Sequence, residues 1–179
     1  MSDPRWALAK TGSIAMSCLL KCASSSIRSS PLFFRNMLNS EVLTVPDRVA
    51  WIRNPQRRLE SAYCHFKHHN NRDTNSQQHW IGPKTTVSWE VFVDFILSES
   101  NLHWGAQTEL LTHNGVYVPT ITERFEDLPK RFKYYMGEDL PPTNASIKFK
   151  TSTYRKADIE ARYKEDFALW RSLGRGKKS

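Results

Sequence analysis

The stretch LLKCASSSI, residues 19–27, places one lysine and three consecutive serines directly after an apolar run at residues 14–20. Serine competes with the backbone for hydrogen bonds inside a helix, so a serine cluster behind a strand-like run favours a turn and a helix N-cap. A strand, a polar turn and a helix start together form a place where backbone N–H groups bind an anion. The alternative is a solvent-exposed serine turn that binds no ligand. The rest of the chain is needed to distinguish an anion-binding turn from this alternative.

The composition predicts one globular domain that attracts polyanions. A chain of 179 residues with 39% hydrophobic residues is long enough for one domain with a substantial hydrophobic core and too short for two domains of ordinary size. The 26 basic and 18 acidic residues give a net charge of +8, and the isoelectric point is about 9.5. Nucleic acid, an acidic polysaccharide and a phosphate-rich small molecule all fit this charge, so only local motifs can choose among them.

The cysteines and the first apolar run bear on the compartment. Cys18, Cys22 and Cys64 are odd in number and show no zinc-ligand spacing, which predicts no metal site and favours a reduced compartment. The run at residues 13–20 is short for a signal sequence and far below a membrane span. We therefore expect a cytoplasmic protein without a membrane span.

Apolar periodicity and turn residues predict alternating strands and helices. Such alternation favours an α/β fold with a largely parallel sheet of about four to five strands, covered by helices on both faces. We expect a single domain over residues 1–179 with its core at about 14–173, an exposed polar loop at 68–86 and a basic tail at 174–179. The predicted strands are 14–20, 41–45, 48–53 and 116–125, and the predicted helices are 25–30, 32–38, 54–66, 89–98, 129–135 and 153–174.

Two strand-to-helix turns carry motifs that resemble those of the sulfotransferase family. The segment KCASSS at residues 21–26 is similar to the family's loop for the 5′-phosphosulfate of 3′-phosphoadenosine 5′-phosphosulfate (PAPS). The segment RNPQRRLESAY at residues 53–63 resembles its Arg-Asp/Asn-Pro-x-x-Arg-x-x-Ser-x-Tyr segment for the 3′-phosphate, and is the closer match. The resemblance implies a P-loop-like, three-layer α/β/α fold.

Further motifs follow in the family's order and resemble its carbohydrate-type branch. They are SWEVFV at 88–93, NLHW at 101–104, RFEDL at 124–128 and YKEDFALW at 163–170. Together the matches span roughly residues 14–173. The resemblance implies transfer of a sulfuryl group from PAPS to a hydroxyl or amine, with a carbohydrate as the expected acceptor and adenosine 3′,5′-bisphosphate as the product.

The resemblance also implies roles for single residues. Lys21 would be catalytic, because its ammonium would stabilise the charge that develops on the leaving phosphate. Arg53 and Ser61 would bind the 3′-phosphate through the guanidinium and the hydroxyl. The 5′ end would be held by the loop residues, which are Lys21, Cys22, Ala23, Ser24, Ser25 and Ser26.

Two residues are candidates for the general base. The acceptor must lose a proton, and related enzymes use Glu or His for this step. Glu41 precedes a short predicted strand, and His103 lies in the NLHW motif; we favour His103. The chain departs from the family pattern at Leu20, where a proline is usual, at Asn54, where Asp is common, and in the short segment between the two phosphate motifs.

Two other functions remain open. The charge and the aromatic residues would also suit a protein that binds nucleic acid or another polyanion, although most aromatics fall on predicted core stripes, which makes nucleic acid the less favoured partner. The second alternative is a relative that binds the nucleotide but transfers no sulfate. The chain lacks the GxxxxGK[ST] motif of nucleotide kinases.

Overall fold

The computed structural model describes residues 6–69, 87–141 and 153–175. Its main sheet contains five strands: β1 (Trp6–Ala9), β2 (Ile14–Ser17), β3 (Phe33–Met37), β4 (Asp47–Ile52) and β7 (Ile121–Arg124). Their order across the sheet is β3-β1-β2-β4-β7. A separate two-stranded hairpin is formed by β5 (Thr112–His113) and β6 (Val116–Tyr117).

The sheet is mixed, and the predicted largely parallel sheet is therefore wrong. β1 pairs antiparallel with both β2 and β3, whereas β2–β4 and β4–β7 are parallel. The turn after β1 contains Gly12 at φ 74°, whose N–H donates to the carbonyl of Ala9. This tight turn sends the chain straight back as β2, because glycine adopts a positive φ without a steric penalty. The α/β class itself is confirmed.

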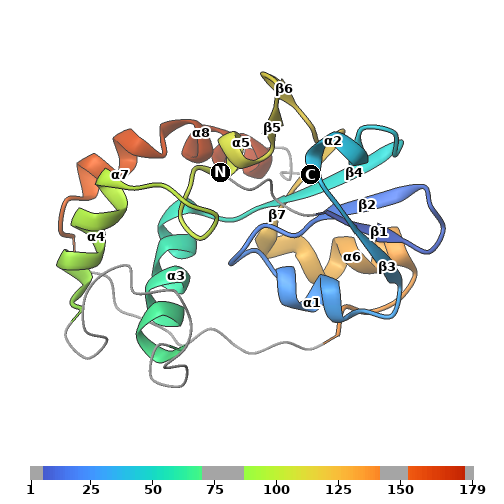
Figure 1. The fold of residues 1–179 in the computed structure, drawn as a ribbon, viewed down its shortest axis with the longest axis horizontal. Coiled ribbons are helices and arrows are strands. Elements are labelled where there is room, and N and C mark those ends of the chain that lie inside the picture. Colours follow the sequence, from blue (N-terminus) through green and yellow to red (C-terminus); the bar gives the residue numbers. More distant parts are fainter. Residues whose placement is uncertain (1–5, 70–86, 142–152, 176–179) are drawn as a thin grey trace.

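Helices cover both faces of the sheet (Figure 1). α1 (Ser24–Ser29) and α6 (Leu128–Met136) lie on one face, and α6 follows a short 3-10 helix, η1 (Phe125–Asp127). α2 (Asn39–Val42), α5 (Gln107–Leu110) and α8 (Lys164–Arg175) lie on the other. The remaining helices, α3 (Pro55–His69), α4 (Trp89–Ser98) and α7 (Lys156–Arg162), pack together beyond one end of the sheet.

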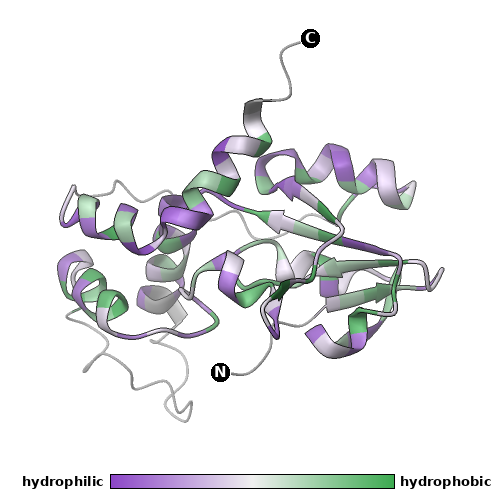
Figure 2. Ribbon diagram, turned by 90° about the horizontal axis from the view of Figure 1, so that it is seen from above, coloured by the Kyte–Doolittle hydropathy of each residue, from purple (hydrophilic) through white to green (hydrophobic). Residues whose placement is uncertain are grey.

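Alternating residues of β4 show how the core is divided. Val49 and Trp51 pack against α1 and α6, while Ala50 and Ile52 pack toward α8, as expected when successive side chains point to opposite faces of a sheet. Figure 2 shows apolar residues along the strands and polar residues on the outer sides of the helices. Among the described residues, no helix is both long and apolar enough to span a membrane.

Several predicted elements differ from the structure. Residues 32–38 were expected to be helical but contain strand β3, and the strand expected at 41–45 is helix α2. The predicted strand at 116–125 is split into β6 and β7, and the predicted helix at 153–174 breaks at Tyr163 into α7 and α8. Residues 68–69 of the predicted loop belong to α3, and 70–86 lie outside the described residues. Gly174 and Arg175 of the predicted tail belong to α8.

Candidate nucleotide-binding site

The two motifs lie at the same edge of the sheet. Lys21 follows the end of β2, Arg53 directly follows β4, and Phe125 directly follows β7. These three strands are parallel neighbours, with Met16 opposite Val49 and Ile52 opposite Arg124. Since parallel strands end at one edge of a sheet, the turns behind them converge there, as at the ligand sites of open α/β sheets.

A direct hydrogen bond joins the two motifs. The Nη1 of Arg53 donates to the backbone carbonyl of Lys21 at 2.9 Å. The guanidinium carbon of Arg53 lies 4.9 Å from the centre of the Phe125 ring, within the range of a cation–π contact. Arg53 is therefore fixed between the Lys21 loop and the turn behind β7.

The loop before α1 has a special backbone. Lys21 and Ala23 adopt φ values of 69° and 61°, the left-handed region that costs a residue with a side chain about 1–2 kcal/mol. The N–H of Cys22 donates to Leu19, and α1 then begins with Ser24. The first N–H groups of a helix lack acceptors within it, so Ser24, Ser25 and Ser26 present donors at this turn.

The hydroxyl of Ser26 is an unusual feature of this turn. Ser26 is 1% exposed, and its Oγ forms no hydrogen bond with any residue that the structure describes. A buried hydroxyl without a partner costs about 1–3 kcal/mol. Ser24 is also buried, whereas Ser25 is exposed. A ligand with oxygen acceptors would satisfy the Ser26 hydroxyl.

Three cations gather around the loop, and the carboxylates of Glu126 and Glu60 act on Arg53 only through longer-range electrostatics. Lys21, Arg53 and Arg58 form no ion pair with a carboxylate among residues 6–69, 87–141 and 153–175. Burial, with smaller effects from the charges of Arg58 and Arg53, lowers the pKa of Lys21 to about 8. Burial likewise lowers the pKa of Arg53, although a guanidinium stays charged at neutral pH. The cluster is therefore electropositive and suited to a multivalent anion.

Arg58 has a positioning function in this cluster. It is 2% exposed, and its three nitrogens donate to the carbonyls of Leu20 at 3.2 Å, Gly105 at 2.6 Å and Leu102 at 3.1 Å. The Arg58 side chain thus connects the backbone directly before Lys21 to the turn that contains His103.

His103 lies beside the cations. Its backbone N–H donates to Asn101 at 2.8 Å, and its ring stacks on His65 with the centroids 5.8 Å apart. Burial, followed by the charges of Lys21 and Arg58, lowers the pKa of His103 to about 4. The imidazole is therefore neutral at pH 7, which is the form that can accept a proton.

Glu41 and Ser61 are placed differently. The carboxylate of Glu41 accepts from the N–H of Leu38 at 2.7 Å and from Arg35 at 3.0 Å, so it caps α2. Among the described residues, no hydrogen bond joins it to Lys21 or His103. Ser61 is partly buried on α3, eight residues after Arg53. Its hydroxyl has no hydrogen-bond partner in the part of the chain that the structure describes.

No protein-family model matches the chain, and no curated protein or solved structure is significantly similar to it. The likeness to sulfotransferases rests on the motifs alone.

Two buried polar residues complete the site and were not predicted from the sequence. Gln107 is fully buried and Asp166 is 1% exposed. Gln107 contacts both Arg53 and Cys22, and Asp166 binds the start of α5. The YKEDFALW motif contains Asp166, but no local pattern marks either residue as part of the site, because their partners lie more than fifty residues away.

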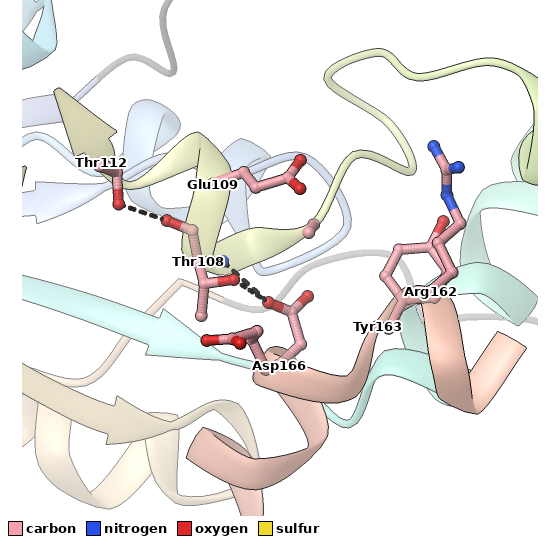
Figure 3. Close-up of a pocket in the computed structure, with 8 residues that line it drawn as sticks. Thr108, Glu109, Thr112, Arg162, Tyr163 and Asp166 are labelled. Atoms are coloured by element: carbon pink, nitrogen blue, oxygen red, sulfur yellow. Dashed lines mark hydrogen bonds between the residues drawn. The ribbon is translucent and has the colours of Figure 1, made fainter. Parts of the chain in front are cut away.

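A cleft of about 530 Å³ opens between α5 and the junction of α7 and α8 (Figure 3). None of the residues proposed for the nucleotide lines it. It contains the exposed carboxylates of Glu109 and Glu165, which repel phosphate groups. The residues that line the cleft are Ala106, Thr108, Glu109, Thr112, Arg162, Tyr163, Glu165 and Asp166. The site at the Lys21 loop is therefore the better candidate for an anionic ligand.

Proposed function

We propose that the protein is a PAPS-dependent sulfotransferase that acts on a hydroxyl or amine, with a carbohydrate as the expected acceptor. The observation that carries the proposal is the hydrogen bond from Arg53 to the carbonyl of Lys21. It joins the two motifs that resemble the family's phosphate-binding segments, 32 residues apart in the chain, into one cationic site. The cytoplasmic location expected from the sequence stays a prediction.

The donors of this site fit a nucleotide with two anionic ends. The N–H groups that begin α1, the buried Ser26 hydroxyl and Lys21 suit the 5′-phosphosulfate. Cys22 and Ala23 would contribute the shape of the loop and its backbone. Arg53, with its guanidinium held by Lys21 and Phe125, and Ser61 would bind the 3′-phosphate.

The chemistry follows from the placement of Lys21 and His103. PAPS supplies the sulfuryl group: a bond forms from the acceptor oxygen or nitrogen to sulfur, and the bond from sulfur to the 5′-phosphate oxygen breaks. Lys21 stabilises the negative charge on the leaving oxygen. His103 takes the acceptor's proton, and it becomes more basic when an anion offsets the charges of Lys21 and Arg58. Glu41, engaged by Leu38 and Arg35, is the less favoured base.

Sulfuryl transfer from labelled PAPS to a panel of carbohydrates tests the proposal. We expect transfer by the wild type and a fall of at least about 100-fold in Lys21→Met and His103→Ala, because each removes a group that acts in the transition state. Lys130→Met is the control, since Lys130 is exposed on α6.

Other results would contradict the proposal. Nucleotide binding without transfer to any acceptor would identify an inactive relative. Binding of long nucleic acids that weakens steeply with salt, without any response to adenosine 3′,5′-bisphosphate, would identify a polyanion-binding protein.

A further inference from the structure

The amide of Gln107 bridges the two halves of the candidate site. Its Oε1 accepts from the N–H of Arg53 at 3.0 Å and from the Cys22 thiol at 3.3 Å, while its Nε2 donates to the carbonyl of Arg53 at 2.9 Å. Cys22 directly follows Lys21. One side chain is therefore bonded both to the residue expected to bind the 3′-phosphate and to the loop expected to bind the 5′-phosphosulfate.

Asp166, in the first turn of α8, holds Gln107 in place. Its Oδ2 accepts from the N–H of Gln107 at 2.7 Å, and its Oδ1 accepts from the N–H and the hydroxyl of Thr108, both at 2.8 Å. Figure 3 shows Asp166 and Thr108 facing each other from α8 and α5. The Nε2 of Gln107 also donates to Oδ2 of Asp166, at 3.4 Å. A charged, buried acceptor with four donors is costly to displace, so α5 and Gln107 have a fixed position.

We propose that Gln107, anchored by Asp166, is a positioning residue that sets the spacing between the Lys21 loop and Arg53. That spacing would make the site selective for a nucleotide that carries both a 5′- and a 3′-phosphate. The inference rests on the proposed function, since it concerns the same site.

The physical reason is that one rigid ligand must occupy two anion-binding sites of the protein at the same time. The second phosphate adds its full affinity only when both sites lie at the distance that the ligand spans. If Gln107 no longer joins Cys22 to Arg53, the hydrogen bond from Arg53 to the carbonyl of Lys21 is left to hold the loop and the arginine together. Their spacing then varies more widely, and each phosphate still finds its own donors. A residue that only stabilises the fold would instead change the affinity for every nucleotide alike.

Titration calorimetry with three ligands separates these cases. The ligands are adenosine 3′,5′-bisphosphate, adenosine 5′-phosphate and adenosine 3′-phosphate. In Gln107→Met, which keeps the volume of the side chain but not its hydrogen bonds, we expect the Kd for the bisphosphate to rise by about tenfold and each monophosphate Kd by less than about twofold.

Asn39→Leu is the matched control. Asn39 is also fully buried, accepts from the indole of Trp6 at 2.7 Å and donates to the carbonyl of Leu110 at 3.2 Å. It thus also holds α5, but among the described residues it forms no hydrogen bond with Cys22 or Arg53. Its replacement should lower the melting temperature and leave the ratio of the three Kd values unchanged.

Asp166→Asn provides a second variant if Gln107→Met does not fold, and it should show the same selective loss. Equal losses for all three ligands, or the same change of ratio in Asn39→Leu, would overturn the positioning role while leaving the proposed function intact. A folded wild type that binds none of the three nucleotides would instead overturn the proposed function, and this inference with it.

Discussion

At the scale of single residues, Lys21 combines features that do not favour a stable fold. Its side chain is largely buried near Arg53 and Arg58, which lowers its pKa to about 8. Its backbone adopts φ 69°, outside the region that a lysine prefers. Unfavourable features of this kind concentrate at functional sites, where the interaction with a ligand compensates for them.

Replacement of Lys21 should stabilise the free protein. In Lys21→Met the free energy of unfolding should rise by about 2 kcal/mol at pH 7, because a buried cation near two others is removed. Urea denaturation measures this difference. A variant that is less stable than the wild type at pH 7 would show that Lys21 makes favourable contacts in the free protein.

The pH dependence gives a second check on Lys21. The ordinary pKa of 10.5 applies to the unfolded chain, and the folded value is about 8. Between these values the unfolded chain binds the extra proton, so the contribution of Lys21 makes the free energy of unfolding rise with pH from about 8 to 10.5. Lys21→Met should lack this rise, and identical pH profiles for the two proteins would contradict the assigned pKa.

The sequence marks the charged residues of the candidate site more clearly than the residues that hold them in place. Lys21 and Arg53 stand in motifs with a recognisable spacing, and the structure brings these two residues into contact. Gln107 and Phe125 acquire their positions only from tertiary contacts, with Gln107 meeting Arg53 across 54 residues of chain. A buried amide has no periodic signature, so it resembles an ordinary surface residue in the sequence.

At the scale of elements, helices with strong local signals were predicted well. α4 has the expected bounds, and Ser88 caps it by accepting from the N–H of Val91. α3 begins at Pro55, with the side chain of Asn54 accepting from the N–H of Arg57. The prediction of a helix at residues 32–38 was wrong because the apolar spacing there suits a helix as well as a strand. Only the pairing of β3 with β1, which sets Leu8 opposite Arg35, makes it a strand.

The turn that carries His103 should depend on Gly105. A Cβ at this position would lie 2.7 Å from the backbone oxygen of Asn101, so Gly105→Ala must open the turn and displace its carbonyl from Arg58. We expect a loss of about 1–3 kcal/mol in stability, together with a loss of nucleotide affinity measured by calorimetry.

Gly137→Ala is the comparison for this variant. Gly137 ends α6 at φ 74° with open space around it, so an alanine there costs about 1 kcal/mol through backbone strain alone. It should leave nucleotide affinity unchanged. Equal affinity in Gly105→Ala and the wild type would show that the turn does not support the site.

At the scale of the whole molecule, the site depends on only part of the sheet. The prediction of a largely parallel sheet was wrong because β1 runs antiparallel to both of its neighbours. The convergence of the two motifs does not depend on β1, since it requires only that β2 and β4 lie side by side and parallel. The edge formed by β2, β4 and β7 therefore carries the cationic cluster despite the mixed topology.

The central claim is that Lys21 and Arg53 belong to one site for adenosine 3′,5′-bisphosphate, and the melting temperature with and without this ligand tests it most directly. A ligand at 100 times its Kd stabilises the folded state by about 2.7 kcal/mol, which corresponds to roughly 5–10 °C for a chain of this size. The wild type and Arg57→Ala, which changes a neighbouring exposed arginine, should both show this rise, and Arg53→Ala should lose it. No rise in the wild type at millimolar ligand, or an equal rise in Arg53→Ala, would contradict the account.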